Sequence, residues 1–168
     1  MVLEFALMAI FPAAMAFAAA MDLFTMTIPN RISLFLLASF LLLAPFAGLT
    51  LADIGYHFVA GIAMLVVGIL MFSRGWIGGG DAKIFAAASL WLGFDYLMEY
   101  ALIASVAGGV LTLLLLFVRK FPLPLFLARQ EWVGRLHDPR GGIPYGVALG
   151  LAAMFVYPST MWMKPIIG

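Results

Sequence analysis

The sequence predicts an all-α protein that crosses a membrane six times. Of its 168 residues, 65% are hydrophobic and only 10% are charged, whereas about 25% of the residues in a typical soluble domain are charged. So few charges cannot cover a water-exposed surface, and we therefore expect lipid to surround most of the chain. The length suits one domain, which we assign to residues 1–168. Because cysteine is absent, the chain has no disulfide bond, thiol nucleophile or cysteine-based zinc site.

Six apolar segments approach or reach the length of about 20 residues that a membrane-spanning helix needs. Backbone groups in lipid must be satisfied within the segment, and no segment alternates as a barrel strand would. The first segment lacks the positive charges that precede a cleavable signal, so we expect it to remain as a span. The six predicted spans are Leu3–Met21, Ile32–Gly48, Ile54–Phe72, Ala82–Leu97, Tyr100–Val118 and Ile143–Trp162.

Lysine and arginine fall almost entirely into alternate connections between these spans. Eight of the nine lie in the first, third and fifth connections, and only Lys164 lies on the opposite side. Positively charged loops remain in the cytoplasm, so we predict that both termini face outward. In the connection at residues 119–142, apolar residues recur near helical spacing among arginines. This pattern predicts either a short helix on the cytoplasmic surface or a solvated basic loop.

Two aspartates at the edges of predicted spans are the candidate catalytic residues. Asp22 follows the first span and Asp81 precedes the fourth. Two complete spans lie between them, so both return to the same membrane face, which the charge distribution makes cytoplasmic. Either residue alone could mark the lipid–water boundary, and Asp81 could also be a helix N-cap. Two close carboxylates, however, share a proton, so that one can activate water while the other polarises a peptide carbonyl.

The residues around the aspartates suggest more than simple turns. Three glycines immediately before Asp81 allow unusual backbone angles and close approach of a ligand, and a proline after Asp22 fixes the entry into the second helix. Other catalytic patterns are absent, because no serine lies in a Gly-x-Ser-x-Gly elbow and there is no His-Glu-x-x-His pair. We therefore expect neither a metal nor a cofactor. The two runs are Gly78-Gly79-Gly80-Asp81 and Ile28-Pro29-Asn30.

These runs resemble the motifs of the type IV prepilin leader peptidases, which are membrane aspartyl proteases of the GxGD class. Three pieces match in order along essentially the whole chain: Asp22 with Ile28-Pro29-Asn30, then Gly78-Gly79-Gly80-Asp81-Ala82-Lys83, then Ile143-Pro144-Tyr145-Gly146. The resemblance implies that Asp22 and Asp81 are the catalytic pair. It also implies supporting or substrate-binding roles for the other matching residues, namely Ile28, Pro29, Asn30, Gly78, Gly79, Gly80, Lys83, Pro144, Tyr145 and Gly146.

The family cuts a short basic leader from pilin-like precursors at the cytoplasmic membrane face, just before their hydrophobic N-terminal helix. The resemblance therefore implies a multi-pass protein of the inner (cytoplasmic) membrane. Its partners would be such a precursor and membrane lipid, with no nucleic acid. The short first connection and the lack of cysteine resemble the compact peptidases of tight-adherence (Flp) pilus systems, with archaeal preflagellin peptidases as neighbours. Methyl transfer, which larger family members perform, is not expected.

Two other classes of protein compete with the endopeptidase. A small proton-coupled transporter or channel subunit would use the two aspartates as proton carriers. Such a relay should also place ionisable residues near the bilayer midplane, and the predicted spans have none there. A membrane scaffold without catalysis would leave the Gly-Gly-Gly-Asp run and the common depth of the two aspartates unexplained. The sequence therefore favours the endopeptidase.

Overall fold

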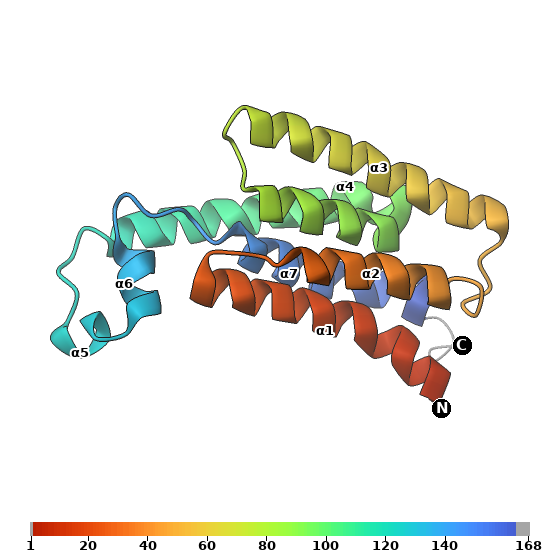
Figure 1. Cartoon of the computed structure of the whole chain (residues 1–168), viewed down its shortest axis with the longest axis horizontal. Coiled ribbons are helices and arrows are strands. Elements are labelled where there is room, and N and C mark those ends of the chain that lie inside the picture. Colours follow the sequence, from red (N-terminus) through yellow and green to blue (C-terminus); the bar gives the residue numbers. More distant parts are fainter. Residues whose placement is uncertain (1, 164–168) are drawn as a thin grey trace.

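The structure, a computed structural model, describes residues 2–163 as a helical bundle with short connections (Figure 1). These residues contain no strand, so the all-α prediction is confirmed. The bundle consists of α1 (Val2–Thr25), α2 (Asn30–Leu43), α3 (Leu51–Ser73), α4 (Gly79–Val118) and α7 (Tyr145–Val156). The remaining elements are α5 (Leu125–Ala128), α6 (Glu131–His137) and the 3-10 helices η1 (Tyr157–Ser159) and η2 (Met161–Met163).

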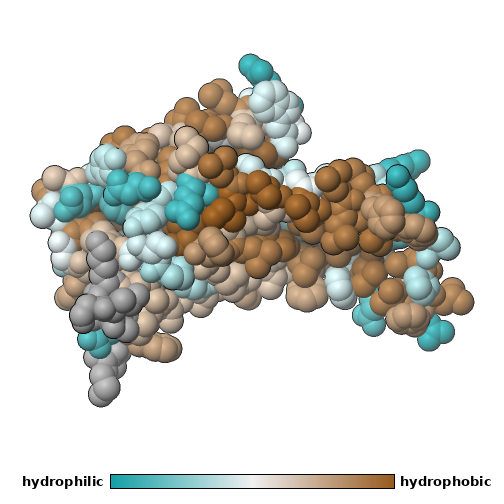
Figure 2. Space-filling model, turned by 180° about the vertical axis from the view of Figure 1, so that it is seen from behind, coloured by the Kyte–Doolittle hydropathy of each residue, from teal (hydrophilic) through white to brown (hydrophobic). Residues whose placement is uncertain are grey.

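Three helical segments are long and apolar enough to cross a membrane: Leu3–Thr25, Leu51–Ser73 and Gly79–Val118. Two shorter apolar segments, Asn30–Leu43 and Tyr145–Ser159, accompany them. Hydrophobic side chains cover the middle of the face shown in Figure 2, and hydrophilic ones collect toward its two ends. This distribution, with a non-polar belt between polar ends, is that of a membrane protein.

α4 folds back on itself at Gly93, which has the non-helical angles φ 66° and ψ −178° (Figure 1). The rings of Phe85 and Tyr100 stack across the fold with centroids 5.4 Å apart, whereas a straight helix would separate these residues by about 22 Å. Glycine is the residue that adopts this backbone conformation without strain, and a Cβ here would lie 3.0 Å from Cε1 of His57. We predicted the break near residues 98–99, because hydropathy marks polar residues rather than backbone geometry.

Other helix boundaries also differ from the prediction. α1 continues past Asp22 to Thr25, whose hydroxyl donates to the Met21 carbonyl at 2.6 Å. α2 ends at Leu43, before a turn, rather than at residue 48. α3 begins with a capping box, in which the Thr50 N–H donates to Asp53 Oδ2 at 2.9 Å. The 119–142 connection contains two short helices, α5 and α6, where we had considered one helix or a solvated loop.

The core is aromatic at the end of the bundle that holds Gly93, which we call the aromatic end. Trp91 Nε1–H donates to the Leu36 carbonyl at 2.9 Å, and Trp162 Nε1–H donates to the Trp91 carbonyl at 2.8 Å. Both buried indoles therefore have the partners that they require. The aromatic end is defined by the buried, mutually packed rings of Phe11, Phe40, Trp91, Tyr157 and Trp162.

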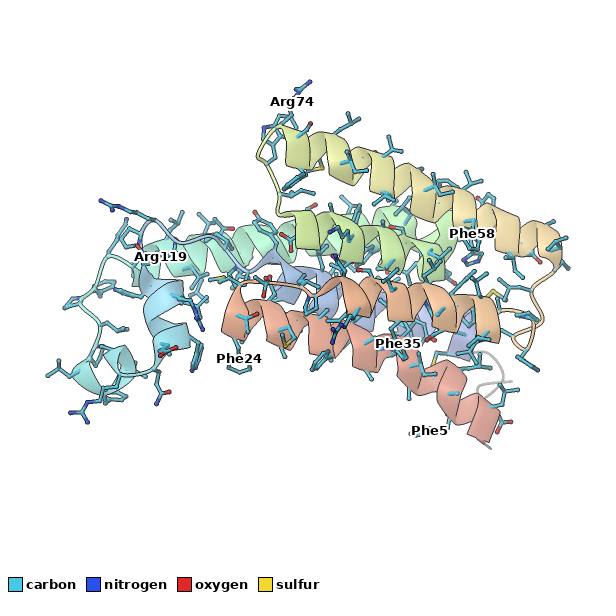
Figure 3. The ribbon with its side chains drawn as sticks, viewed as in Figure 1. Phe5, Phe24, Phe35, Phe58, Arg74 and Arg119 are labelled. Carbon is cyan, nitrogen blue, oxygen red and sulfur yellow. The ribbon has the colours of Figure 1, made fainter. Side chains whose placement is uncertain are left out.

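α1 and α3 end, and α7 begins, at the opposite end of the bundle (Figure 1). Arg74 and Arg119 lie toward this end together with Phe24, whereas Phe5 lies at the other end (Figure 3). Lys164, the basic residue predicted on the far side, lies outside the described residues. Arg74 directly follows α3 and Arg119 directly follows α4, so both lie where these helices end.

Candidate active site

Asp22 and Asp81 lie at the end of the bundle opposite the aromatic end, and we call this the aspartate end. Asp22 is near the end of α1 and only 6% exposed, and Asp81 is in the first turn of α4. Ile28 links their surroundings, because it contacts both Gly80, which precedes Asp81, and Gly146, which lies against Asp22. The two residues therefore lie in one neighbourhood despite their wide separation in sequence.

Gly146, in the first turn of α7, binds Asp22. Its N–H donates to Asp22 Oδ2 at 2.7 Å in a buried hydrogen bond. The first N–H groups of a helix lack partners within the helix, and the helix dipole attracts a negative charge there. A Cβ at position 146 would lie 2.9 Å from the same oxygen and 2.7 Å from Ile28 Cδ1. The absence of a side chain is therefore what lets α7 approach α1 so closely.

The glycine run sets the position of Asp81. Gly78 is the N-cap of α4, and its N–H donates to Asp81 Oδ2 at 3.2 Å. Asp81 is therefore the third residue of the helix, and its carboxylate accepts a hydrogen bond from the backbone of the N-cap residue. The alternative that Asp81 is itself the N-cap, which the sequence allowed, is wrong. Gly79 packs beside the ring of Phe72, since a Cβ there would lie 3.4 Å from Cε2.

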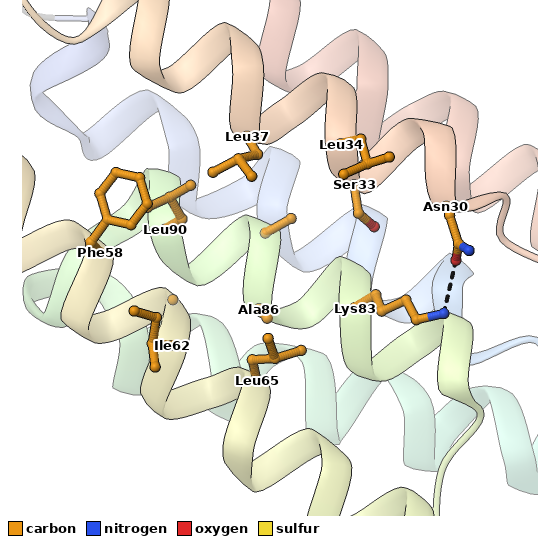
Figure 4. Close-up of a pocket in the computed structure, with 12 residues that line it drawn as sticks. Asn30, Ser33, Leu34, Leu37, Phe58, Ile62, Leu65, Lys83, Ala86 and Leu90 are labelled. Atoms are coloured by element: carbon orange, nitrogen blue, oxygen red, sulfur yellow. Dashed lines mark hydrogen bonds between the residues drawn. The ribbon is translucent and has the colours of Figure 1, made fainter.

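Ile28 connects the surroundings of the two aspartates. A Cβ on Gly80 would lie 3.1 Å from Ile28 Cβ, and Ile28 also contacts Gly146, the hydrogen-bond partner of Asp22. Pro29, with φ −61°, is the N-cap of α2. The next residue, Asn30, accepts a hydrogen bond from Lys83 Nζ at 2.8 Å through its Oδ1 (Figure 4). The segment after α1 therefore touches the starts of both α4 and α7.

The last matching run orients α7. Pro144 is fully buried and is the N-cap of the helix. Tyr145 packs on the second half of α4, where a Cβ on Gly108 would lie 2.5 Å from its Cε1. The Thr112 hydroxyl lies 3.4 Å from the Tyr145 hydroxyl. The structure thus brings all ten predicted supporting residues into one connected region, in which Tyr145 contacts α4 rather than an aspartate.

Tyr100 is a neighbour of Asp81 that the sequence did not identify. It is fully buried, and its ring stacks on that of Phe85, one helical turn after Asp81. This hydroxyl has no hydrogen-bond partner among residues 2–163, although buried tyrosines usually pair theirs. It is therefore a spare hydrogen-bond donor near the site. The sequence could not identify Tyr100 as part of the site, because Tyr100 meets Phe85 only when α4 folds back at Gly93.

α6 packs against the end of α1, near Asp22. Arg135 Nη2 donates to the Phe24 carbonyl at 2.7 Å, and the rings of Phe24 and Trp132 meet edge to face with centroids 5.2 Å apart. Arg119 Nε donates to the Leu136 carbonyl at 2.7 Å. Arginines of the long connection therefore hold α6 at the aspartate end.

Each aspartate accepts one backbone hydrogen bond, through Oδ2. Within the described part of the chain, Oδ1 of each has no such partner. A pair of carboxylates with free oxygens can accept, hold and donate protons. Residues 2–163 contain no group of three or more His, Cys, Asp or Glu side chains arranged to hold a metal ion.

The model of the type IV leader peptidase family matches residues 9–113. The chain belongs to this family. The matched residues include both aspartates, Ile28-Pro29-Asn30 and the glycine run, and the match ends before Gly146. The same comparisons match no curated protein and no solved structure to this chain. Membership confirms the resemblance found from the motifs, and it supports a leader peptidase that processes prepilin-like substrates.

Proposed function

We propose that this protein is a membrane-embedded aspartyl endopeptidase that removes the leader from pilin-like precursors at the cytoplasmic membrane face. The proposal rests on the convergence of Asp22 and Asp81, which reach one end of the bundle from α1 and α4 and share Ile28 as a neighbour of their surroundings. Family membership supports the reaction and the substrate class. The free Oδ1 atoms described above supply the groups that an acid–base mechanism needs.

In this proposal the chain crosses the inner membrane six times, as α1, α2, α3, the two halves of α4, and α7. Successive helices run in opposite directions along the bundle (Figure 1). Arg74 and Arg119 lie toward the same end as Phe24, two residues after Asp22 (Figure 3). Since basic connections stay in the cytoplasm, both aspartates, α5 and α6 face the cytoplasm, and the N-terminus faces outward.

The two carboxylates act as an acid–base pair. Close carboxylates share a proton because both cannot ionise easily. The ionised member takes a proton from water as the water oxygen attacks the scissile carbonyl carbon, and the protonated member donates to the carbonyl oxygen. The resulting tetrahedral intermediate then breaks its C–N bond: the newly protonated aspartate donates a proton to the departing amine, and the other aspartate takes a proton from a hydroxyl of the intermediate, which becomes the new carboxyl group. The hydrogen bonds from Gly146 and Gly78 hold the carboxylates in place for these transfers.

Conversion of each aspartate to asparagine tests the mechanism. Asp22→Asn and Asp81→Asn keep the side-chain shape but remove the acid, so each should reduce leader cleavage in proteoliposomes by roughly 10²- to 10⁴-fold. Asp95→Asn is the matched control, because Asp95 is an exposed carboxylate just after Gly93, away from the site. Mass determination of both fragments locates the cut. Normal cleavage by either active-site variant would contradict the proposal. Aspartate-dependent proton flux without cleavage would support the transporter instead.

A further inference from the structure

A cleft of about 460 Å³ lies next to the aspartate end, between α2 and α3, with the first half of α4 as its floor (Figure 4). Both α2 and α3 pack on α4. Each of the three helices lines the cleft with residues at positions i, i+3, i+4 and i+7. On α2 these are Asn30, Ser33, Leu34 and Leu37, and the same spacing begins at Phe58 on α3 and at Lys83 on α4.

The cleft is polar at one end and apolar at the other. Asn30, Ser33 and Lys83 are at the end nearest Asp81, and Phe58 and Leu90 are at the far end (Figure 4). Ser33 Oγ is buried and has no hydrogen-bond partner within residues 2–163. The polar end can therefore bind backbone groups of an extended peptide, whereas the rest of the cleft offers only apolar contact.

The shape of the cleft fits a helix. An i, i+3, i+4, i+7 stripe covers two helical turns, about 10 Å in length, and three such stripes surround the position that another helix would occupy in a bundle. The small residues Gly61, Ala86 and Ala87 are part of the lining. Small residues let helix backbones approach closely in membranes, where packing rather than the hydrophobic effect drives association.

We propose that this cleft binds the hydrophobic helix of the precursor, with the start of that helix at Lys83 and its apolar side chains extending toward Phe58. The inference rests on the proposed function, because a precursor that is cut just before its hydrophobic helix must present that helix beside the aspartates. Lys83 is two residues from Asp81, and Asn30 is two residues from Ile28. The cleft therefore begins where the candidate active site ends. Ser33 and Lys83 bind carbonyl groups between the cut and the helix, and the helix packs by its side chains.

Cross-linking identifies the occupant directly, because the chain has no cysteine of its own. Leu65 lines the cleft and is 37% exposed, whereas Leu70 on the same helix is 60% exposed and does not line it. Leu65→Cys and Leu70→Cys are each combined with Asp81→Asn in the full chain. The probe is a pilin-like precursor that the unmodified protein cleaves, carrying one cysteine in its hydrophobic helix. On mild oxidation we expect disulfide cross-linking from Leu65→Cys and at least about tenfold less from Leu70→Cys.

A bulky side chain in the cleft tests its contribution to catalysis. Leu65→Trp should raise KM about tenfold with kcat nearly unchanged, since binding is blocked but the catalytic groups are untouched. Leu70→Trp, the control, should change neither constant. Cross-linking from Leu70→Cys alone or from neither position would overturn the proposal, as would a normal KM for Leu65→Trp. If a lipid acyl chain occupied the cleft instead of the precursor, neither cysteine variant would cross-link to the precursor and Leu65→Trp would keep a normal KM. Failure of the unmodified protein to cleave any precursor would instead overturn the proposed peptidase function.

Discussion

The aromatic end and the aspartate end of the bundle are built in opposite ways. At the aromatic end, polar atoms are paired inside the protein: the Tyr157 hydroxyl donates to the Leu7 carbonyl, and His57 Nδ1 lies 2.7 Å from the Leu90 carbonyl oxygen. At the aspartate end, Asp22 and Asp81 each keep one oxygen without a partner among the described residues, and Tyr100 keeps a free hydroxyl. Large rings fill the first end, and glycines allow close approach at the second.

The same half of α4 connects these two ends. Trp91 and Asp81 are ten residues apart on it, or about 15 Å along the axis. The buried indole of Trp91 anchors this half of α4, and the helix in turn fixes the position of the Asp81 carboxylate. Unpaired polar groups cost stability, so the stability of the bundle must come mainly from the other end. Stability and chemistry should accordingly be separable by mutation, and the four predictions below test this separation.

The largest expected effect is on stability, at the aromatic end. Trp91→Ala removes a fully buried side chain and its hydrogen bond to Leu36, and should lower the free energy of unfolding in detergent by about 3–5 kcal/mol. Trp76→Ala is the control, because Trp76 is 67% exposed, and it should change this free energy by less than about 0.5 kcal/mol. Equal effects of the two variants would mean that the aromatic end does not hold the bundle together.

The second expected effect is on activity, at the aspartate end. Gly146→Ala places a methyl group 2.9 Å from Asp22 Oδ2, so it should displace the carboxylate and reduce kcat by about 100-fold. Gly150→Ala, one turn further along α7, is equally crowded, with its Cβ 2.9 Å from the Met15 carbonyl oxygen. It should cost stability, about 1–3 kcal/mol, while the surviving folded protein keeps its kcat. Similar kcat losses in both would show that general crowding, rather than contact with Asp22, is responsible.

Replacing one tyrosine at each end by phenylalanine compares how much a tyrosine hydroxyl contributes to stability at the two ends. Tyr157→Phe removes a hydroxyl that bonds to the Leu7 carbonyl, and should destabilise the fold by about 1 kcal/mol. Tyr100→Phe removes a buried hydroxyl without a described partner, and should leave stability unchanged or raise it by up to about 1 kcal/mol. Thermal unfolding of both variants measures the contrast. If Tyr100→Phe is the less stable of the two, its hydroxyl is bound in the native protein.

The smallest expected effect concerns the hydrogen bond between Lys83 and Asn30. Because it is exposed, its net value should be about 0.5–1.5 kcal/mol. A double-mutant cycle with Lys83→Met and Asn30→Ala measures this coupling in the free energy of unfolding. A coupling near zero would mean that the hydrogen bond contributes nothing to stability. The start of α2 would then be joined to the start of α4 by the packing of Ile28 against Gly80 rather than by this hydrogen bond.

The sequence predicted which end of the bundle each aspartate occupies, because that follows from counting apolar segments. The two apolar helices between Asp22 and Asp81, α2 and α3, return the chain to the same end of the bundle. The motif residues also proved to be neighbours in space, since Asn30 meets Lys83 and Gly146 meets Asp22. Their catalytic roles stay predictions until the substitutions above are made.

Lateral packing could not be predicted in this way. The contact of Ile28 with both Gly80 and Gly146 depends on how the helices are arranged around the bundle, and hydropathy carries no such information. The fold at Gly93 was misplaced because its immediate neighbours, Leu92 and Phe94, are apolar, and the backbone angles that mark the fold cannot be read from hydropathy. Without that fold, the position of Tyr100 near Asp81 has no signal in the sequence.

Gly93 also sets the overall dimension of the protein. A continuous helix from Gly79 to Val118, 40 residues in all, would be about 60 Å long, or roughly twice the thickness of the bilayer core. Such a rod would have to extend its apolar side chains far into water. One glycine, with the His57 ring in the space where its side chain would project, therefore makes this segment short enough to lie within a single bilayer.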